Sequence, residues 1–242
     1  MKAIVIKNSK ITQEPAYITE LYPLLYKNKK WARFFDDNRV QAVLTFGFYR
    51  KILEDMLEDI GTNSSVLQVG CTFGNQIEKT AEKIGKYGEY TVIDVVKSEI
   101  ERVKSKVHGQ KINLEIQDAR KPLSRKYDTV LCYMLLHELP IASREKVINN
   151  VLDSVRDGGR AIFVDYNQPT DWNLLRFILK PFNRLFFPFT ESLWKTPIKN
   201  YAKKSTHFAW YKKTYGSGMY QKVVAVRRTP DEKKPAVKQS FY

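Results

Sequence analysis

Short apolar runs alternate with helical patterns through the middle of the chain. Five runs of strand length stand out, at Ser65–Val69, Tyr90–Asp94, Ile112–Ile116, Lys126–Tyr133 and Arg160–Val164. Between them, apolar residues recur at helical spacing in Gln76–Ile84, Ser98–Val107 and Ser143–Val155, the last with Ser143 as its expected cap. Strands that alternate with helices predict an α/β fold with a mostly parallel, doubly wound sheet and right-handed crossovers.

The pattern changes on both sides of this region. Residues 1–18 read as an arm with little periodicity, and Ile18–Lys30 and Asp37–Ile60 read as two helices. After Asp165 the alternation stops, and two later runs, His207–Thr214 and Tyr220–Arg227, predict a C-terminal antiparallel hairpin that completes a seven-stranded sheet. We therefore expect an arm and helical lid over 1–60, an α/β domain over 61–228 and a disordered charged tail over 229–242.

Composition indicates the cell compartment in which the protein works. No run of about 18 apolar residues occurs, and the first residues are too short an apolar stretch for a signal peptide. The two cysteines, Cys71 and Cys132, have no metal-like or disulfide-like spacing, which favours a reducing compartment. We expect a cytoplasmic protein, or one that lies on the inner membrane (on a mitochondrial membrane in a eukaryote).

The net charge of +15 is concentrated late in the chain, where residues 171–228 hold twelve Lys or Arg against two acids. Such a surface attracts both nucleic acid and anionic lipid.

The turn after the first strand carries the strongest chemical signal. Gly70 and Gly74 punctuate it, and Asp94 ends the next strand about twenty residues later, as in nucleoside-binding α/β units. The turn resembles the D-x-G-x-G-x-G turn of S-adenosylmethionine-dependent transferases, with Gln68 in place of the acid and Thr72 in place of the middle glycine. A class I S-adenosylmethionine-dependent methyltransferase (Rossmann-like) fold is therefore expected. The predicted cofactor-binding residues are Gln68, Gly70, Cys71, Thr72, Gly74, Asp94, Val95, Asp118 and Ala119.

Candidate catalytic residues follow the fourth and fifth strands. Tyr133, His137 and Glu138 come after one, and Asp165 and Tyr166 after the other, so both groups would line the pocket where donor and acceptor meet. The alternatives are that His137 and Glu138 only begin a helix or fix a loop, and that Asp165 is a turn acid beside a packed tyrosine.

The insert over 171–200 contains an aromatic-rich amphipathic stretch, 172–189. Arg176, Lys180 and Arg184 recur every four residues, opposite bulky apolar side chains. This pattern suits a helix in a membrane interface, and equally a lid helix whose basic face is solvated.

Several segments together resemble the rhodoquinone biosynthesis family over about residues 19–228. Leu67–Gly74 is similar to its L-Q-V-A-C-V-Y-G, Leu135–Glu138 to its L-L-H-E, and Val164–Tyr166 to its V-D-Y. Further similarities are Phe187–Trp194 to E-P-F-A-x-x-L-W, Gly218–Lys222 to G-x-Y-Q-K, and Gly47–Arg50 to G-N-Y-x-R-L. Departures include Phe48 for Asn, Gly70 for Ala and Thr190 for Ala.

The resemblance implies a transferase that replaces a methoxy group of ubiquinone by an amino group. S-adenosylmethionine would be the amino donor, and a divalent metal, which is manganese in the family, would assist. The insert would dock the pocket at the anionic membrane surface that holds the quinone. Gln68, as an amide, would leave the donor amine less protonated, and His137 would take a proton.

The alternatives are a methyltransferase acting on a lipid, a quinol or another hydrophobic acceptor, and an RNA methyltransferase. Nucleic acid is not expected as a partner, because the basic region lacks an RNA module and is rich in aliphatics.

Overall fold

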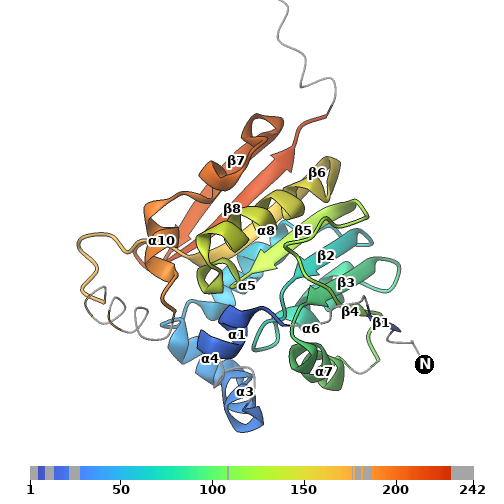
Figure 1. Cartoon of the computed structure of the whole chain (residues 1–242), viewed down its shortest axis with the longest axis horizontal. Coiled ribbons are helices and arrows are strands. Elements are labelled where there is room, and N and C mark those ends of the chain that lie inside the picture. The colour runs from blue at the N-terminus through green and yellow to red at the C-terminus, as the bar shows by residue number, and fades with distance from the viewer. Residues whose placement is uncertain are drawn as a thin grey trace, which may run out of the picture.

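The computed structural model of the protein describes residues 5–8, 14–21, 28–107, 109–175, 177, 181 and 187–229. Within this part, eight strands form one sheet in the order β1-β4-β3-β2-β5-β6-β8-β7 (Figure 1). The strands are β1 (Val5–Asn8), β2 (Ser65–Val69), β3 (Glu89–Asp94), β4 (Asn113–Ile116), β5 (Tyr127–Tyr133), β6 (Val155–Tyr166), β7 (Phe208–Tyr215) and β8 (Tyr220–Arg227). Neighbours from β1 to β6 run parallel, and β8 is antiparallel to both β6 and β7. The predicted fold class, its seven strands and its C-terminal hairpin are confirmed.

The eighth strand corrects the expectation of an arm without regular structure. β1 pairs in parallel with the edge strand β4, with Val5 opposite Asn113 and Asn8 opposite Ile116. A strand of four residues is too short to show a clear period of two in the sequence, and it is held by backbone hydrogen bonds to an edge that was otherwise open.

Helices cover both faces of the sheet and bury two hydrophobic clusters. α5 (Tyr49–Glu58), α6 (Gln76–Ile84) and α7 (Lys97–Lys106) pack on one face, and α8 (Ile141–Asp153) with α10 (Thr190–Lys195) packs on the other. Consecutive residues of the central strands alternate between the clusters: Ile162 and Val164 belong to the first, and Phe163 to the second. Three short 3₁₀ helices are η1 (Leu136–Glu138), η2 (Ile198–Tyr201) and η3 (Ser205–His207).

The second expected N-terminal helix, Asp37–Ile60, is divided in two, α4 (Asn38–Leu44) and α5. Before it lie α1 (Ala16–Leu21) and α3 (Lys29–Phe35), and residues 22–27 of the expected helix Ile18–Lys30 lie outside the described residues. α1, α3 and α4 lie below the sheet in Figure 1. The break between α4 and α5 lies at Phe46 (φ 50°) and Gly47 (φ 81°). The Thr45 hydroxyl at the end of α4 accepts a hydrogen bond from the amide of Tyr49, the first residue of α5, at 2.9 Å and so links the two helices. Left-handed backbone at two successive residues ends a helix, although the apolar spacing continues.

Two boundaries in the second half also differ from expectation. α8 begins at Ile141 after Pro140, so Ser143 lies inside its first turn and provides no cap. The fifth strand was expected to begin at Arg160, whereas β6 begins at Val155 and its register shifts between the partners of Tyr127 and Thr129. Gly158, with φ 73°, lies in this irregular stretch.

Parts of two expectations fall outside the described residues. These are the basic stripe Arg176, Lys180 and Arg184 of the insert, and the tail from residue 230 onward. In the part of the chain that is described, no helix is long and apolar enough to cross a membrane.

Candidate active site

The carboxyl ends of the parallel strands meet at one edge of the sheet, where ligands bind in open α/β folds. The turn after β2 contains Gly70 and Gly74, with φ of 88° and 76°, a conformation that favours glycine. The Gly70 amide donates to Ile93 O at 2.8 Å, which ties this turn to the end of β3. A Cβ at Gly70 would lie 3.2 Å from Leu135, the residue before η1. The turn, β3 and the loop after β5 thus converge.

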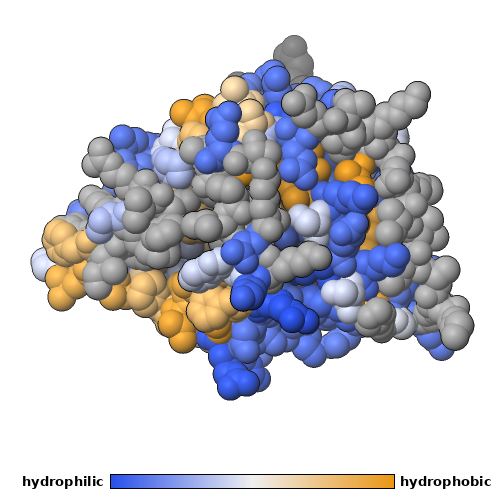
Figure 2. All heavy atoms as spheres, turned by 60° about the horizontal axis from the view of Figure 1, so that its bottom comes forward, coloured by the Kyte–Doolittle hydropathy of each residue, from blue (hydrophilic) through white to orange (hydrophobic). Residues whose placement is uncertain are grey.

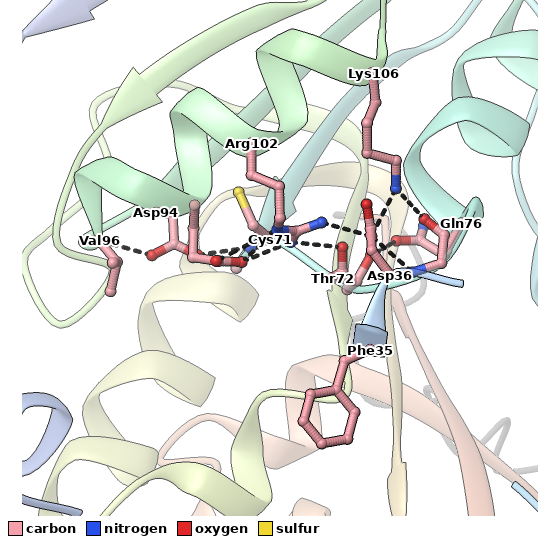
Figure 3. A network of polar contacts seen from close by, with 12 residues as sticks. Phe35, Asp36, Cys71, Thr72, Gln76, Asp94, Val96, Arg102 and Lys106 are labelled. Atoms are coloured by element: carbon pink, nitrogen blue, oxygen red, sulfur yellow. Dashed lines mark hydrogen bonds and ion pairs between the residues drawn. The ribbon is translucent and has the colours of Figure 1, made fainter. Parts of the chain in front are cut away.

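Asp94 ends β3 beside this turn and is half-buried. Its carboxylate accepts from the Cys71 amide at 2.6 Å and from the Val96 amide at 2.8 Å (Figure 3). Burial raises the pKa of Asp94 to about 6, although both backbone hydrogen bonds oppose the rise. Each oxygen keeps an acceptor position, so the ionised carboxylate can bind a pair of vicinal hydroxyls. Val95 and Cys71, on either side, are also half-buried.

Gln68 lies in the interior, away from the ligand edge. Its amide nitrogen donates to Gly70 O at 3.1 Å and to Gln76 Oε1 at 2.8 Å, and its oxygen accepts from the Gln76 amide and the Tyr90 hydroxyl. The Thr72 hydroxyl joins the same network by donating to Gln76 Oε1 at 2.8 Å. All four hydrogen-bonding positions of the Gln68 amide are therefore used inside the protein. It supports the turn from below and has none left for the amine of a ligand, contrary to the role expected for it.

A group of charged side chains holds the same turn from outside. Asp36, at the end of α3, accepts from the Gly74 amide at 3.1 Å, from Arg102 at 2.7 Å and from Lys106 at 2.8 Å. Arg102 also donates to Thr72 O at 2.9 Å and pairs with Glu99 (Figure 3). The cofactor turn is therefore fastened to α3 and α7 together. Sequence patterns do not predict this group, because Asp36 is far along the chain from Arg102 and Lys106.

Asp118 follows β4 and is engaged by Arg120. Both of its oxygens accept from the Arg120 guanidinium at 2.8–3.1 Å, and one also accepts from the Arg120 amide at 2.9 Å. These contacts lower the pKa of Asp118 despite the opposing effect of burial. The carboxylate is thus ionised and largely saturated, so we expect a contact to adenine to be shared with Arg120. Ala119 O accepts from Asn150 of α8, which fixes this loop.

Tyr17 of α1, a residue that the sequence did not single out, lies over this region. Burial raises the pKa of its hydroxyl, and the charges that act on it are Arg120, Glu138, Asp94 and Asp118. Because these four residues follow three different strands, Tyr17 must lie above the edge at which those strands end.

His137 and Asp165 form a buried pair at the same edge. His137 Nδ1 lies 2.8 Å from Asp165 Oδ1, and the other Asp165 oxygen accepts from the Leu136 amide at 2.7 Å. Asp165 is not exposed at all, and His137 is 3% exposed. Burial alone would lower the pKa of His137, but the charge of Asp165, its hydrogen bond and the charge of Glu138 outweigh it and raise the pKa. The loop that carries His137 follows Met134, which has a left-handed φ of 49°.

Aromatic rings surround the imidazole. Tyr166 and Phe187 meet it edge to face, with ring centroids 4.7 and 4.9 Å away. Tyr220 lies 5.4 Å from Tyr166 and extends this group. Tyr133, by contrast, is buried in the hydrophobic cluster under α5 and takes no part in the pair. The structure therefore brings together His137, Asp165 and Tyr166 of the predicted catalytic set and leaves Tyr133 in the core.

Arg144 of α8 is fully buried and holds the His137 loop in place. Its five N–H groups donate to Leu136 O, Leu139 O, Phe189 O, Ser192 Oγ and Tyr201 Oη at 2.8–3.2 Å. All its donors are thus satisfied by neutral oxygens from η1, the end of the insert, α10 and η2. A sequence signal existed: Arg144 lies on the apolar stripe that continues with Val147, Ile148 and Val151.

The metal that the resemblance implies has no fitting site here. Within the described ranges, no group of three or more His, Cys, Asp or Glu side chains could hold a metal ion. Both Asp165 oxygens are already engaged, by His137 and by backbone amides. We therefore derive no step through manganese.

Two hollows lie elsewhere. One of about 380 Å³ lies near Gly61 and Arg156, and one of about 320 Å³ near Thr91 and Asn113. Both are lined by residues at the starts or middles of strands, so the strand-end chemistry above defines the candidate site better than hollow size does.

Comparison with known proteins identifies one domain within the chain. Residues 66–159 match the family model described as a methyltransferase domain. This stretch contains the glycine turn, Asp94, Asp118 and His137. No curated protein sequence matches the chain.

Solved structures share the fold at low sequence identity. One is the N-methyltransferase NodS from Bradyrhizobium japonicum with S-adenosyl-L-homocysteine, at 16% identity and a TM-score of 0.55 over 89% of this chain and 100% of that one. Another is a Burkholderia thailandensis 1,6-didemethyltoxoflavin-N1-methyltransferase, at 12% identity and a TM-score of 0.56, covering 88% of each chain. A third is human N-acetylserotonin methyltransferase with bound SAM, at 14% identity and a TM-score of 0.57, over 88% of this chain and 60% of the human one. The fold is therefore that of S-adenosylmethionine-dependent methyltransferases.

Proposed function

We propose that this protein is an S-adenosylmethionine-dependent transferase that replaces a methoxy group of ubiquinone by an amino group. One observation carries the proposal: the His137–Asp165 pair lies at the same sheet edge as Asp94 and the glycine turn. A nucleoside site and a buried base are thereby next to each other. The methyltransferase-domain match over residues 66–159 supports the cofactor.

The cofactor fits the residues that the strand ends bring together. Asp94 would accept from both ribose hydroxyls, and Gly70 and Gly74 let the backbone come close to the ligand. Arg102, Lys106 and Asp36 keep the turn rigid, so little order has to be gained when the ligand binds. S-adenosylmethionine would supply the transferred group, amino or methyl.

Convergence of the family-like segments favours a quinone as the acceptor. The segments similar to L-L-H-E, V-D-Y and G-x-Y-Q-K contribute His137, Tyr166 and Tyr220; Tyr166 contacts both of the other rings. Phe187, which stands where E-P-F-A-x-x-L-W has Glu, also contacts the His137 ring. Segments far apart in the chain thus build one aromatic surface around one imidazole. Such a surface suits a flat, apolar ring, which stacks on or abuts aromatic side chains.

The pair can move one proton in either direction. The Asp165 carboxylate accepts from Nδ1 and so leaves Nε2 as the proton-accepting nitrogen, with Glu138 3.9 Å from it. Nε2 would take the proton from an attacking nitrogen and return it to the departing methoxy oxygen, so that methanol leaves and the ring carbon is joined to the nitrogen. The amino group is released only when the N–Cα bond of the donor also breaks. The quinone ring would accept the two electrons of that cleavage, and water would release the donor's carbon skeleton as a 2-oxo acid and leave an aminoquinol. The rings of Tyr166 and Phe187 exclude water around the imidazole.

Methyl transfer is the second candidate, and it fits the comparisons at least as well. The matched family is named for methyl transfer, and the same imidazole would deprotonate a quinol or phenol oxygen. Gln68 does not favour amino transfer over methyl transfer, because its amide is engaged inside the protein.

The experiment is to incubate the protein with S-adenosylmethionine and a short-tailed ubiquinone, or the corresponding quinol, and to identify products by mass spectrometry. An amino-for-methoxy product supports the proposal, a methylated quinol supports the second candidate, and the absence of both in samples that bind S-adenosylmethionine contradicts both acceptors.

A further inference from the structure

α4 and the turn after it expose apolar side chains. None of the residues of α4 is buried, and Val43 is 75% exposed. Phe46, in the turn that follows, is 39% exposed although its φ of 50° is unfavourable for a side chain with a Cβ. A short helix without a fully buried residue gains little stability from the protein's own core.

The start of the insert exposes a second apolar group. Trp172 is 94% exposed, Leu174 76% and Phe177 64%. Single exposed apolar residues are ordinary on protein surfaces, but three so close in sequence, each with most of its surface in water, are not.

The two groups flank the same hairpin turn between β7 and β8. On one side, the Tyr220 hydroxyl donates to Leu44 O at 3.1 Å, and a Cβ at Gly216 would lie 3.0 Å from the Phe48 ring. On the other side, the Asn173 amide donates to Gly216 O at 3.1 Å and the Thr170 backbone to Ser217 O at 3.0 Å. The end of α4 and the start of the insert are therefore neighbours on either side of that turn.

This turn also borders the candidate active site. Tyr220 begins β8 directly after it, and the Tyr220 ring packs on Tyr166, which contacts His137. Figure 2 shows hydrophobic residues gathered along the left of the face it presents, while much of the rest of that face is hydrophilic.

We propose that Val43, Phe46, Trp172, Leu174 and Phe177 form a docking rim that inserts into an anionic lipid bilayer from both sides of the site. Charge complementarity selects this occupant, because residues 171–228, which contain the second group, hold twelve Lys or Arg against two acids. Arg39 and Arg50, with side chains 95% and 88% exposed, bracket Val43 and Phe46, and each pairs with one acid, Asp37 and Glu54. In the sequence, Arg176, Lys180 and Arg184 follow the second group. Large apolar side chains among basic ones bind an interface through apolar burial and attraction to anionic headgroups.

The rim extends the membrane contact expected from the insert alone to the N-terminal helices. Its purpose, delivery of a membrane-resident acceptor to His137, rests on the proposed function, whereas lipid binding itself does not. Two anchors on opposite sides would hold the site facing the bilayer, which a single amphipathic helix would not achieve.

The test is co-sedimentation of the full chain with vesicles of phosphatidylcholine and phosphatidylglycerol. The variants are Val43→Ser with Phe46→Ser, and Trp172→Ser with Leu174→Ser. Tyr87→Ser is the control, because Tyr87 is 74% exposed but precedes β3, at the opposite end of the strands. Each pair should weaken vesicle binding by about tenfold or more, and the control should bind like the parent. Unchanged melting temperatures would show that the variants are folded.

Four outcomes overturn the rim. The first three are no vesicle binding by the parent protein, unchanged vesicle binding by the α4 pair, and a change in oligomeric state in place of a change in lipid binding. The fourth is that RNA displaces the parent protein from vesicles and both pair variants bind RNA as the parent does. Turnover of a water-soluble quinone analogue distinguishes a failure of the docking rim from a failure of the proposed function. Rim variants should keep that turnover, so its absence in the parent would count against the reaction and leave the rim intact.

Discussion

His137 Nδ1 lies 2.8 Å from Asp165 Oδ1, and the carboxylate beneath it has no exposed surface. Asp165 also accepts from the backbone amides of Leu136 and Tyr166, so the imidazole is oriented by a group that is itself fixed. This is the arrangement that fixes a tautomer and keeps a base directed at its substrate.

Replacing His137 by Ala should lower kcat by about 10²- to 10⁴-fold, the usual contribution of a positioned base. Affinity for S-adenosylmethionine should stay within about twofold, because the residue acts on the reaction step. Steady-state kinetics and calorimetry measure the two quantities. His207→Ala is the matched control, since His207 is exposed at the start of β7 and should be neutral. Equal losses of affinity and turnover would assign His137 to binding.

Cofactor affinity should depend on pH through Asp94. Its pKa of about 6 means that the carboxylate is protonated as pH falls below that value, and it then loses the charge that strengthens acceptance from ribose hydroxyls. Affinity should therefore be constant well above pH 6 and fall below it. Asp94→Asn should bind about tenfold or more weakly at neutral pH, since charged hydrogen bonds contribute about 1.5–3 kcal/mol each. The affinity of the variant should not fall further below pH 6. If it falls as the affinity of the parent protein does, the pH dependence belongs to another group.

Gly74→Ala should destabilise the protein more than Gly109→Ala. Both glycines have similar left-handed φ, 76° and 79°, but only at Gly74 does a Cβ meet atoms, with Tyr49 Oη 2.5 Å away. In both variants the left-handed backbone costs an alanine about 1 kcal/mol of stability. Only in Gly74→Ala does the clash with Tyr49 add to that cost. Denaturant unfolding of both variants gives the difference. Equal costs would mean that Tyr49 gives way without penalty.

Arg144→Met should lower the free energy of unfolding by about 3 kcal/mol or more, because each buried acceptor left unpaired costs about 1–3 kcal/mol. Arg144→Lys should recover part of it, since an ammonium can satisfy at most three acceptors. The charge of the Arg144 guanidinium lowers the pKa of His137. Without it the pKa of His137 rises, so in folded Arg144→Met the pH below which turnover falls should be higher than in the parent protein. A pH–rate profile with unchanged limbs and full turnover would make Arg144 purely structural.

The sequence predicted the fold well where pattern and burial coincide. β2 and α6 match their expected bounds, because strand and helix are each bounded by glycines or polar turns. The prediction was wrong where a local backbone choice overrides periodicity, as at Phe46–Gly47 between α4 and α5. It also missed β1, whose pairing depends on an open sheet edge that no local pattern reveals.

For the site, the sequence could place residues at strand ends but not orient them. His137 and Asp165 were both expected at this edge, while their hydrogen bond depends on how the loops after β5 and β6 meet. Gln68 shows the limit most clearly: its position in the turn suggested ligand contact, yet its partners Gln76 and Tyr90 draw it inward. The membrane contact stays a prediction.

The central claim is transfer of nitrogen from S-adenosylmethionine to a quinone at the His137–Asp165 edge. The most direct measurement uses S-adenosylmethionine labelled with heavy nitrogen in its amino group and heavy carbon in its methyl group, with a short-tailed ubiquinone, and reads the product mass. We predict a product that carries the heavy nitrogen, lacks one methoxy group, and is absent with His137→Ala. A product that carries the heavy methyl carbon, or an amino group of natural nitrogen, would contradict the account.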